Sequence, residues 1–173
     1  MKLKKATKDN ITELQQISLE AYTKNSADHW NENGLEIYLE NEFGDKRIKM
    51  DLNNSLIAYY LIQSNKKTVG FLKINYETSQ LSIEDNCELE KLYMLPEYAG
   101  LGIGKAALKE AIKEIGKLGK QLLFVCVIDT NANAIAFYKK MGFKFHSKTR
   151  LEDTYFKEEL KGLNRMCLEL NKL

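Results

Sequence analysis

The 173-residue chain lacks several features that would indicate particular classes of protein. Its 26 basic and 24 acidic residues give a net charge of +2, so no excess of positive charge indicates nucleic-acid binding. No apolar run approaches the length of a membrane span, and residues 1–5 lead into polar sequence rather than a signal peptide. We therefore expect a cytoplasmic protein with no nucleic-acid or membrane partner.

Cysteine and histidine are both scarce. Cys87, Cys126 and Cys167 are odd in number and far apart, so we expect reduced thiols rather than a disulfide framework. Cys126 lies in a β-branched run, which favours a core position over a nucleophile. His29 and His146 are the only histidines, and neither has the spacing of a metal ligand, so we expect no metal site.

The residues that are present suffice for one domain over residues 1–173. The chain is 44% hydrophobic, which allows a sizeable core, and it contains no repeats or linker. Apolar patterns predict strands at residues 2–6, 56–63, 69–76, 89–94, 122–128, 145–149 and 165–170. Residues 25–34 and 77–85 are expected to be loops, and residues 64–67 a turn. This order predicts an α/β domain with a mixed sheet.

Four helices are expected from apolar residues at helical spacing. The first carries Ile11, Leu14, Ile17 and Ala21 after a cap at Thr7 or Asp9, and the second covers residues 35–43. The third carries Ala107, Leu108, Ala111, Ile112, Ile115 and Leu118 on one face, and Gly119 is its expected left-handed cap. The fourth covers residues 131–141 and is closed by Gly142, with Phe143 packing back.

A glycine-spaced loop is the most informative feature of the chain. The strand at residues 89–94 runs into a turn at Pro96, and Gly100, Gly102 and Gly104 follow before a helix begins. Bare N–H groups at a helix N-terminus bind phosphate, and glycines let the backbone approach the anion closely. The loop therefore predicts a site for a phosphorylated ligand.

Two familiar phosphate-binding motifs fit this loop poorly. A nucleotide-triphosphate P-loop needs four residues before its Gly-Lys pair and then Ser or Thr, whereas three residues separate Gly100 from Gly104 and Ala106 follows Lys105. We exclude it. A dinucleotide fingerprint matches locally at residues 102–107, with Asp129 in place of the ribose-binding acid. Only 44 residues follow Asp129, too few for the second half of that fold, so it stays a remote alternative.

A second motif favours an acyl-CoA site. The segment at residues 131–143, Asn-Ala-Asn-Ala-Ile-Ala-Phe-Tyr-Lys-Lys-Met-Gly-Phe, resembles the signature of the GNAT superfamily of acyl-CoA-dependent N-acetyltransferases, as does the glycine loop. Both motifs stand in the family's order, with the strand at residues 122–128 between them. The likeness covers most of the chain and is closest to bacterial PaiA-like spermine/spermidine acetyltransferases.

The resemblance implies a single-domain GNAT fold, with a mixed and mostly antiparallel central sheet flanked by about four helices. It implies acetyl-CoA as cosubstrate and transfer of its acetyl group to a primary amine. One departure concerns Ala99, where the family has Gln or Arg. A side-chain contact near the pyrophosphate is therefore missing, and the backbone N–H groups must do more.

Acyl transfer to an amine requires that the amine lose a proton, and free amines have a pKa near ~10. Glu90 is the candidate base, because it lies in the strand before the loop, where related polyamine acetyltransferases place an acidic residue that acts directly or through water. Strand alternation places Glu88 and Glu90 on one face and Leu89 and Lys91 on the other. The alternative is that both glutamates are ordinary edge charges.

Tyr138 is the second catalytic candidate, because the family's Tyr at this position directs its hydroxyl at the CoA sulfur and can protonate the departing thiolate. Its alternative role is a cap contact with Phe143, and both roles can hold at once. Asn131 either caps its helix or contacts the pantetheine arm. The implied cofactor-binding set comprises Leu92, Tyr93 and Met94, whose backbone would pair with pantetheine, the loop residues Gly100, Leu101, Gly102, Ile103, Gly104, Lys105 and Ala106, and also Asn131 and Lys140. Lys105 and Lys140 are either CoA phosphate ligands or ordinary surface lysines.

The acceptor is expected to be a small-molecule amine, and the resemblance implies a polyamine. Nine acidic residues are candidates for the acceptor groove: Glu20, Asp28, Glu32, Glu36, Glu40, Glu42, Glu84, Asp85 and Glu88. They would attract a polycation if they surround that groove. The alternative is that they lie on ordinary solvated helix faces. The pair His29-Trp30 would line that groove or a dimer contact. A protein N-terminus, a lysine or an antibiotic amine remains possible as acceptor, as does a non-catalytic acyl-CoA sensor. The protein is expected to be a monomer or a homodimer.

Overall fold

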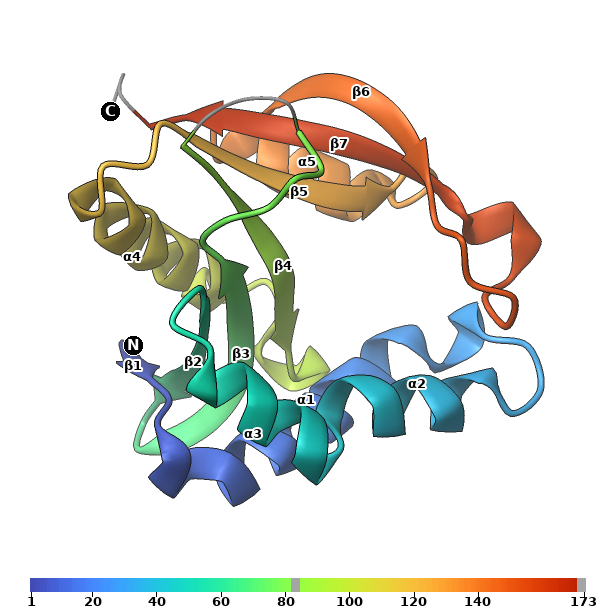
Figure 1. Cartoon of the computed structure of the whole chain (residues 1–173), viewed down its shortest axis with the longest axis horizontal. Helices are drawn as coiled ribbons and strands as arrows, with labels where there is room; N and C mark the ends of the chain where they lie inside the picture. Colours follow the sequence, from blue (N-terminus) through green and yellow to red (C-terminus); the bar gives the residue numbers. More distant parts are fainter. Residues whose placement is uncertain (82–84, 171–173) are drawn as a thin grey trace.

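A seven-stranded sheet runs through the molecule in the order β1-β2-β3-β4-β5-β7-β6 (Figure 1). Its strands are β1 (Lys2–Lys5), β2 (Ile57–Ser64), β3 (Lys67–Asn75), β4 (Asn86–Met94), β5 (Leu122–Ile128), β6 (Lys144–Arg150) and β7 (Gly162–Glu169). The computed structural model describes residues 1–81 and 85–170. Every neighbouring pair is antiparallel except β4 and β5, which confirms a mixed and mostly antiparallel sheet.

The described residues form five α-helices and four short 3-10 turns. The α-helices are α1 (Ile11–Ser26), α2 (Gly34–Phe43), α3 (Asp45–Asn53), α4 (Ile103–Lys117) and α5 (Ala132–Lys140), and the 3-10 turns are Lys8–Asn10, Ala27–His29, Pro96–Tyr98 and Glu158–Leu160. The sequence pattern did not predict α3, because Ile48 and Asp51 are its only buried residues and give no apolar stripe. The predicted loop at residues 25–34 is shorter than expected, since α1 continues to Ser26.

The helices cover the two faces of the sheet in separate groups. On one face, Leu108, Ala111 and Ile115 of α4 and Tyr138 of α5 share a core with β2 to β5 and β7. On the other face, α1, α2 and α3 share a core with β2 and β3. The prediction that Leu118 belongs to the buried face of α4 is wrong, because this residue lies beyond the last helical turn and is 58% exposed. Gly119 follows with φ +74°, as predicted for a left-handed cap.

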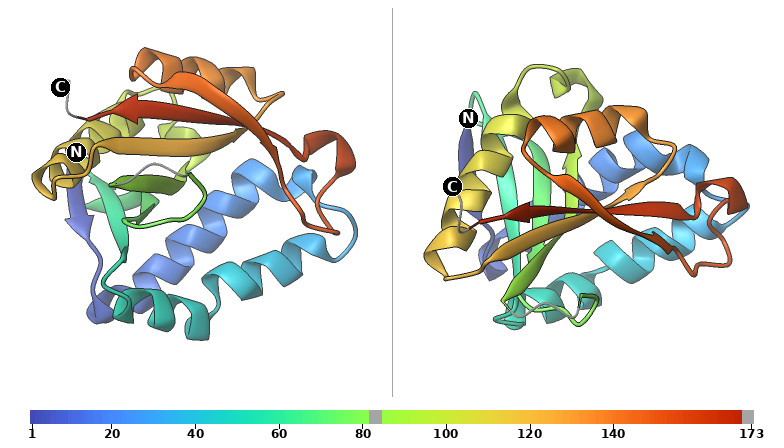
Figure 2. Two further views of the ribbon diagram at one scale, coloured as in Figure 1. Left: turned by 45° about the horizontal axis from the view of Figure 1, so that its top comes forward. Right: turned by 90° about the horizontal axis from the view of Figure 1, so that it is seen from above.

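The parallel pair β4 and β5 forms a fork. Asn86, Cys87 and Glu88 pair with residues 122–124 of β5, and beyond Glu88 the two strands diverge (Figure 1). From there on β4 pairs only with β3, and β5 only with β7. Seen from above, β5, β7 and β6 lie over α1 and α2 (Figure 2). Residues 89–94 therefore present to the fork a strand edge that β5 does not cover.

A β-bulge lies in this exposed part of β4. Lys73 of β3 pairs with Lys91, and the next residue, Ile74, pairs with Leu89, so Glu90 has no partner on β3. The bulge turns Lys91 to the same face as Glu90, where its ammonium group lies over the ring of Tyr38 at 5.8 Å. The expectation that Lys91 shares a face with Leu89 is thus wrong, because strand alternation fails across a bulge.

Candidate active site

The glycine loop delivers a row of backbone donors at the start of α4. Gly100 and Gly102 have φ of +75° and +76°, a conformation that only glycine adopts without strain. The first intrahelical bond runs from the Ala106 amide to the Gly102 carbonyl at 3.0 Å. The amides of Ile103, Gly104 and Lys105 therefore precede the helical ladder and have no intrahelical acceptor, as in anion sites at helix N-termini. Ala106, which the sequence placed in the same set, uses its amide inside the helix.

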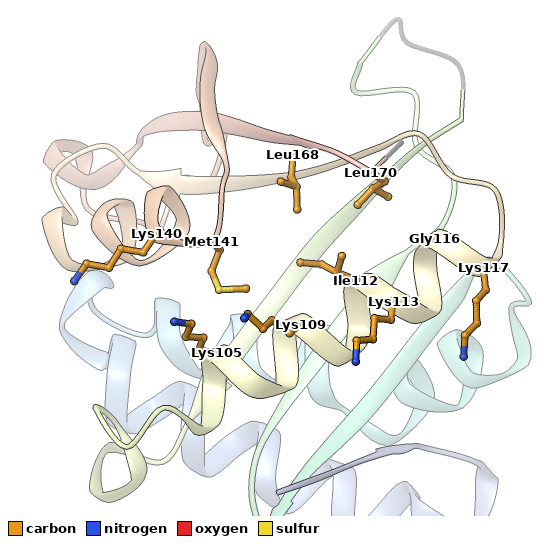
Figure 3. Close-up of a pocket in the computed structure, with 10 residues that line it drawn as sticks. All are labelled: Lys105, Lys109, Ile112, Lys113, Gly116, Lys117, Lys140, Met141, Leu168 and Leu170. Atoms are coloured by element: carbon orange, nitrogen blue, oxygen red, sulfur yellow. The ribbon is translucent and has the colours of Figure 1, made fainter. Parts of the chain in front are cut away.

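A pocket of about 730 Å³ lies beside α4 and brings together cationic and apolar side chains (Figure 3). It is lined by five lysines, Lys105, Lys109, Lys113, Lys117 and Lys140, and by Ile112, Gly116, Met141, Leu168 and Leu170. Lys113 and Lys117 pair with Glu110 and Glu114 on α4, whereas Lys105, Lys109 and Lys140 form no ion pair within residues 1–81 and 85–170. The fold thus places two predicted ligands, Lys105 and Lys140, on one pocket.

Lys109 is a pocket residue that the sequence analysis missed. It stands four residues after Lys105, so the two side chains project from the same helix face. Figure 3 shows both at the end of the pocket where Lys140 of α5 also lies. The four-residue spacing was visible in the sequence, but nothing there showed which face of α4 meets α5.

The exposed edge of β4 combines buried side chains with accessible backbone. Leu92 packs toward α4 and α5, and Tyr93 packs on the opposite face, where its ring lies 5.0 Å from that of Tyr22. Both side chains therefore serve the core, as expected. The Met94 carbonyl already accepts a hydrogen bond from Asn25 Nδ2 at 2.8 Å. An extended ligand in the fork would thus pair chiefly with the backbone ahead of Met94.

Glu90 projects from the bulge into a cluster of charges. Its Oε1 accepts hydrogen bonds from Lys73 Nζ at 2.8 Å and from Lys91 Nζ at 3.1 Å. Burial alone would raise the pKa of Glu90, but the ammonium groups of Lys91 and Lys73 outweigh it and hold the pKa below its ordinary value. Glu90 is therefore ionised at neutral pH.

Glu88 shares a face with Glu90, as predicted, yet it has a different environment. It is 6% exposed, and its Oε2 accepts a hydrogen bond from Gln80 Nε2 at 3.2 Å. Burial, and then the adjacent charge of Glu90, raise the pKa of Glu88 to about 7. The two environments shift the pKa values of the two carboxyl groups in opposite directions. Glu90 therefore stays ionised, while Glu88 exchanges a proton near neutral pH.

Tyr138 and Asn131 lie at the two ends of α5. Asn131 Oδ1 accepts the Ala134 amide at 3.0 Å, so Asn131 caps the helix. Tyr138 is buried, with its ring 5.4 Å from that of Phe143, and the Phe143 amide donates to the Tyr138 carbonyl at 3.0 Å. Burial raises the pKa of Tyr138, so its hydroxyl keeps its proton. That hydroxyl forms no hydrogen bond with any described residue.

The acidic residues named as acceptor-groove candidates are spread over several environments. Glu88 and Glu42 lie close to Glu90 and its lysines, whereas Glu20 pairs with Lys24 at 2.7 Å on an exposed face of α1. Most of the others are exposed: Asp28, Glu32, Glu36, Glu40 and Asp85. Glu84 lies outside the described residues. The structure therefore gathers only a minority of these carboxylates at the fork.

Trp30 belongs to the core rather than to an open surface. It is 7% exposed, and its ring packs against Tyr38 at 4.7 Å and Phe156 at 4.9 Å. An isolated bridge between Trp30 and Phe156 ties the end of the α1 segment to the loop before β7. His29 lies beside the same phenylalanine at 5.8 Å, and burial lowers its pKa. His29 and Trp30 thus pack against Phe156, and Trp30 also packs against Tyr38 of α2.

Within residues 1–81 and 85–170, no helix combines the length and apolar character needed to cross a membrane. No group of three or more His, Cys, Asp or Glu side chains in the same residues has a geometry suited to a metal ion.

Comparisons with known proteins agree with this geometry. Residues 11–143 match the model of the acetyltransferase (GNAT) family. An uncharacterised N-acetyltransferase of Methanocaldococcus jannaschii is 24% identical over 143 residues, which cover 82% of this chain and 60% of the relative. The chain therefore spans less than two thirds of that relative's length. A spermidine N(1)-acetyltransferase of Thermoplasma acidophilum is 24% identical over 148 residues, covering 83% of this chain and 88% of the relative.

A solved structure shows the same fold. The crystal structure of a PaiA N-acetyltransferase from Thermoplasma acidophilum in complex with coenzyme A superposes with a TM-score of 0.76 at 22% identity, over 97% of this chain and 98% of the other. The architecture of the sheet and helices is therefore shared along the whole chain.

Proposed function

This chain belongs to the acetyltransferase (GNAT) family, and on that premise we propose that it transfers the acetyl group of acetyl-CoA to a primary amine of a small molecule. The observation that carries the proposal is the fork between β4 and β5, whose open edge leads directly into the glycine loop. An extended thioester substrate would occupy that edge while its pyrophosphate meets the first turn of α4. The sheet and the helix thereby align one ligand along a continuous path.

The residues present suit the parts of acetyl-CoA. The amides of Ile103, Gly104 and Lys105 offer donors to a pyrophosphate without a side chain in the way. The lysine-lined pocket offers Lys109 and Lys140 to the phosphate on the ribose, with Ile112 and Met141 as apolar surface for the adenosine. The pantetheine arm would take up backbone hydrogen bonds along residues 92–94, in the manner of an added strand, except at the Met94 carbonyl, which already accepts from Asn25.

The reaction needs one proton removed and one returned. The amine nitrogen attacks the thioester carbonyl, the C–N bond forms, the C–S bond breaks, and CoA leaves as a thiolate. Glu90 is positioned on the fork edge to take the ammonium proton, directly or through water, because it is ionised at neutral pH. Tyr138 donates to the departing sulfur. Burial raises the pKa of Tyr138 and so keeps its phenol protonated. Because a higher pKa also makes the phenol a weaker acid, its hydroxyl stabilises the departing thiolate chiefly by a hydrogen bond rather than by complete transfer of its proton.

Glu88 is a second candidate for the proton acceptor. A base works best when its pKa lies near the working pH, and burial sets the pKa of Glu88 at about 7. Glu90 would then act as a fixed anion that holds the ammonium group beside it. Separate replacement of each carboxylate by an amide distinguishes the two assignments.

A polyamine such as spermidine or spermine is the acceptor we propose. The relative from Thermoplasma acidophilum named as a spermidine N(1)-acetyltransferase supports this choice, and adjacent carboxylates at the fork suit an ammonium group. Most of the remaining acidic residues give it no support, because they are exposed or paired with basic residues.

The decisive experiment measures thiol release from acetyl-CoA with spermidine, spermine, an N-protected lysine and a peptide N-terminus as acceptors. Release that depends on an amine, and is fastest with a polyamine, is the expected result. Faster release with the lysine or the peptide would keep the acetyltransferase and discard the polyamine. Binding of CoA without release from any amine would instead indicate an acyl-CoA sensor.

A further inference from the structure

Six side chains, Glu90 among them, form a closed ring of alternating charge. Lys73 Nζ lies 2.8 Å from Glu90 Oε1 and 2.9 Å from Asp51 Oδ2. Lys91 Nζ lies 3.1 Å from the same Glu90 oxygen and 2.8 Å from Glu42 Oε2. Arg47 closes the ring, with contacts of 3.1 Å to Asp51 and 3.6 Å to Glu42.

The ring joins four elements, and three of its side chains are buried while those of Glu42, Glu90 and Arg47 are 20%, 22% and 37% exposed. The side chain of Lys73 on β3 is 0% exposed, that of Lys91 on β4 is 8% exposed, and that of Asp51 on α3 is 6% exposed. Glu42 adds the end of α2. Three cations face three anions, so the ring carries no net charge, and every buried ammonium group has two carboxylate partners. The bulge makes this closure possible, because it turns Lys91 to the side of Glu90.

Of the three carboxylates in the ring, Glu90 is the one that belongs to the open edge of the fork, because Glu42 lies on α2 and Asp51 on α3. Both lysines contact its Oε1, and its Oε2 forms no hydrogen bond with any described residue. One oxygen is therefore fixed by two ammonium groups while the other remains for a ligand.

We propose that Lys73 and Lys91 are positioning residues for the acetyl transfer, which hold Glu90 as a fixed, ionised carboxylate on the fork edge. The inference rests on the proposed function. Protonation of Glu90 would leave Lys73 and Lys91 each short of one charged partner in a buried place, where an unpaired charge is costly. The ring thus opposes protonation of Glu90 and also stops its side chain from turning away from the fork.

The other charges near Glu90 do not cancel this effect. Glu88 on β4 acts in the opposite sense, because its negative charge disfavours a second carboxylate beside it. Glu42 and Asp51 lie behind the lysines, Arg47 adds a further positive charge, and Tyr59 of β2 donates its hydroxyl to Asp51 at 2.9 Å. Burial would raise the pKa of Glu90, yet the two lysines keep it lowered.

The test removes the Lys73 charge without leaving a buried charge unpaired. The double variant Lys73→Met with Asp51→Asn deletes one cation and one anion, and Asn still offers an acceptor to the Tyr59 hydroxyl. The carboxyl carbon of Glu90 is followed by ¹³C NMR against pH, with its signal assigned by its loss in Glu90→Gln. Lys49→Met is the control, because Lys49 lies on α3 in an exposed pair with Asp45.

In the double variant we expect the Glu90 titration to move up by about 1–3 pH units, the usual effect of a neighbouring opposite charge. The acid limb of kcat should move with it, and neither should move in Lys49→Met. An unchanged Glu90 titration overturns the proposal, and a moved titration with an unmoved acid limb overturns its link to catalysis. The proposed function is judged separately, by thiol release from the wild-type protein, so its failure is not confused with failure of the ring.

Discussion

Replacement of Gly102 by valine should remove most of the stabilisation of this protein by CoA while leaving the fold intact. Gly102 has φ +76°, and a Cβ built there meets nothing within 4 Å. The substitution therefore meets no steric clash in the free protein, and its cost is backbone strain of about 1–3 kcal/mol. The added side chain points into open space at the N-terminus of α4, which is where the pyrophosphate is expected.

The size of the effect follows from the number of donors lost. CoA at a hundredfold over its Kd stabilises the native state by about 2.7 kcal/mol, which raises Tm by roughly 5–11 °C in a protein of this size. Loss of one or two charge-assisted hydrogen bonds costs about 1.5–3 kcal/mol each, which weakens Kd by at least tenfold. A hundredfold weaker Kd leaves a stabilisation of only about 0.4 kcal/mol at the same CoA concentration.

Gly119→Val is the matched control. Gly119 has φ +74°, and a Cβ added there also meets nothing within 4 Å, but this glycine lies at the opposite end of α4. Both variants should therefore lose similar stability, and only Gly102→Val should lose the CoA-induced rise in Tm, measured by differential scanning fluorimetry. A full CoA response in Gly102→Val, or an equal loss in Gly119→Val, would refute the phosphate-site assignment. A Tm rise with NAD in place of CoA would revive the dinucleotide alternative.

The remaining predictions concern catalysis and acceptor choice. Glu90→Gln should slow thiol release most near neutral pH and be partly rescued at alkaline pH, where the amine is already deprotonated, while an equal loss at all pH values would contradict a role in proton removal. Glu88 should make the free energy of unfolding fall as pH rises from about 4.5 to 7, because the folded state favours its protonated form, whereas His29 acts in the opposite sense below pH 6.5, because folding lowers its pKa. In urea titrations against pH, the Glu88→Gln variant should therefore lack the falling contribution that wild-type protein shows. Tyr138→Phe should keep Tm and CoA affinity, because the ring contact with Phe143 survives, yet it should slow acetyl transfer; a lower Tm with unchanged turnover would make the hydroxyl structural. Spermidine should give a higher kcat/KM than an N-protected lysine. If exposed carboxylates steer the substrate, this advantage should shrink as salt rises, because salt screens the interaction between exposed charges over a distance of roughly 8–10 Å at physiological ionic strength.

Much of the fold was predictable because its signals are local. Residues 64–67 were expected to form a turn, and Asn65 and Lys66 indeed have φ of 49° and 64° between β2 and β3. The apolar spacing in α4 depends only on the geometry of one helix. Ile48 and Asp51 of α3 show where such signals end, because a short helix with a polar buried residue has no pattern of its own.

The candidate site also combines features that local sequence predicts with features that depend on tertiary packing. By itself, the sequence determined the glycine loop, and it offered the cap at Asn131 and the packing of Tyr138 on Phe143 as one of two roles for each residue. These features were within its reach because each depends on backbone conformation or on neighbours within a few residues. Only the tertiary structure decided that Glu90 sits in a bulge, that Lys91 joins its face, and that Glu88 is buried beside it.

The charge ring shows most clearly why the tertiary structure was needed. The partners Lys73 and Asp51 are 22 positions apart, and Lys91 and Glu42 are 49 apart, so no periodicity in the sequence links them. Their pairing depends on the register of β3 against β4 and on the packing of α2 and α3 on that face. Burial then makes each charge depend on its partners, because a side chain removed from water keeps its charge only where an opposite charge replaces the solvent.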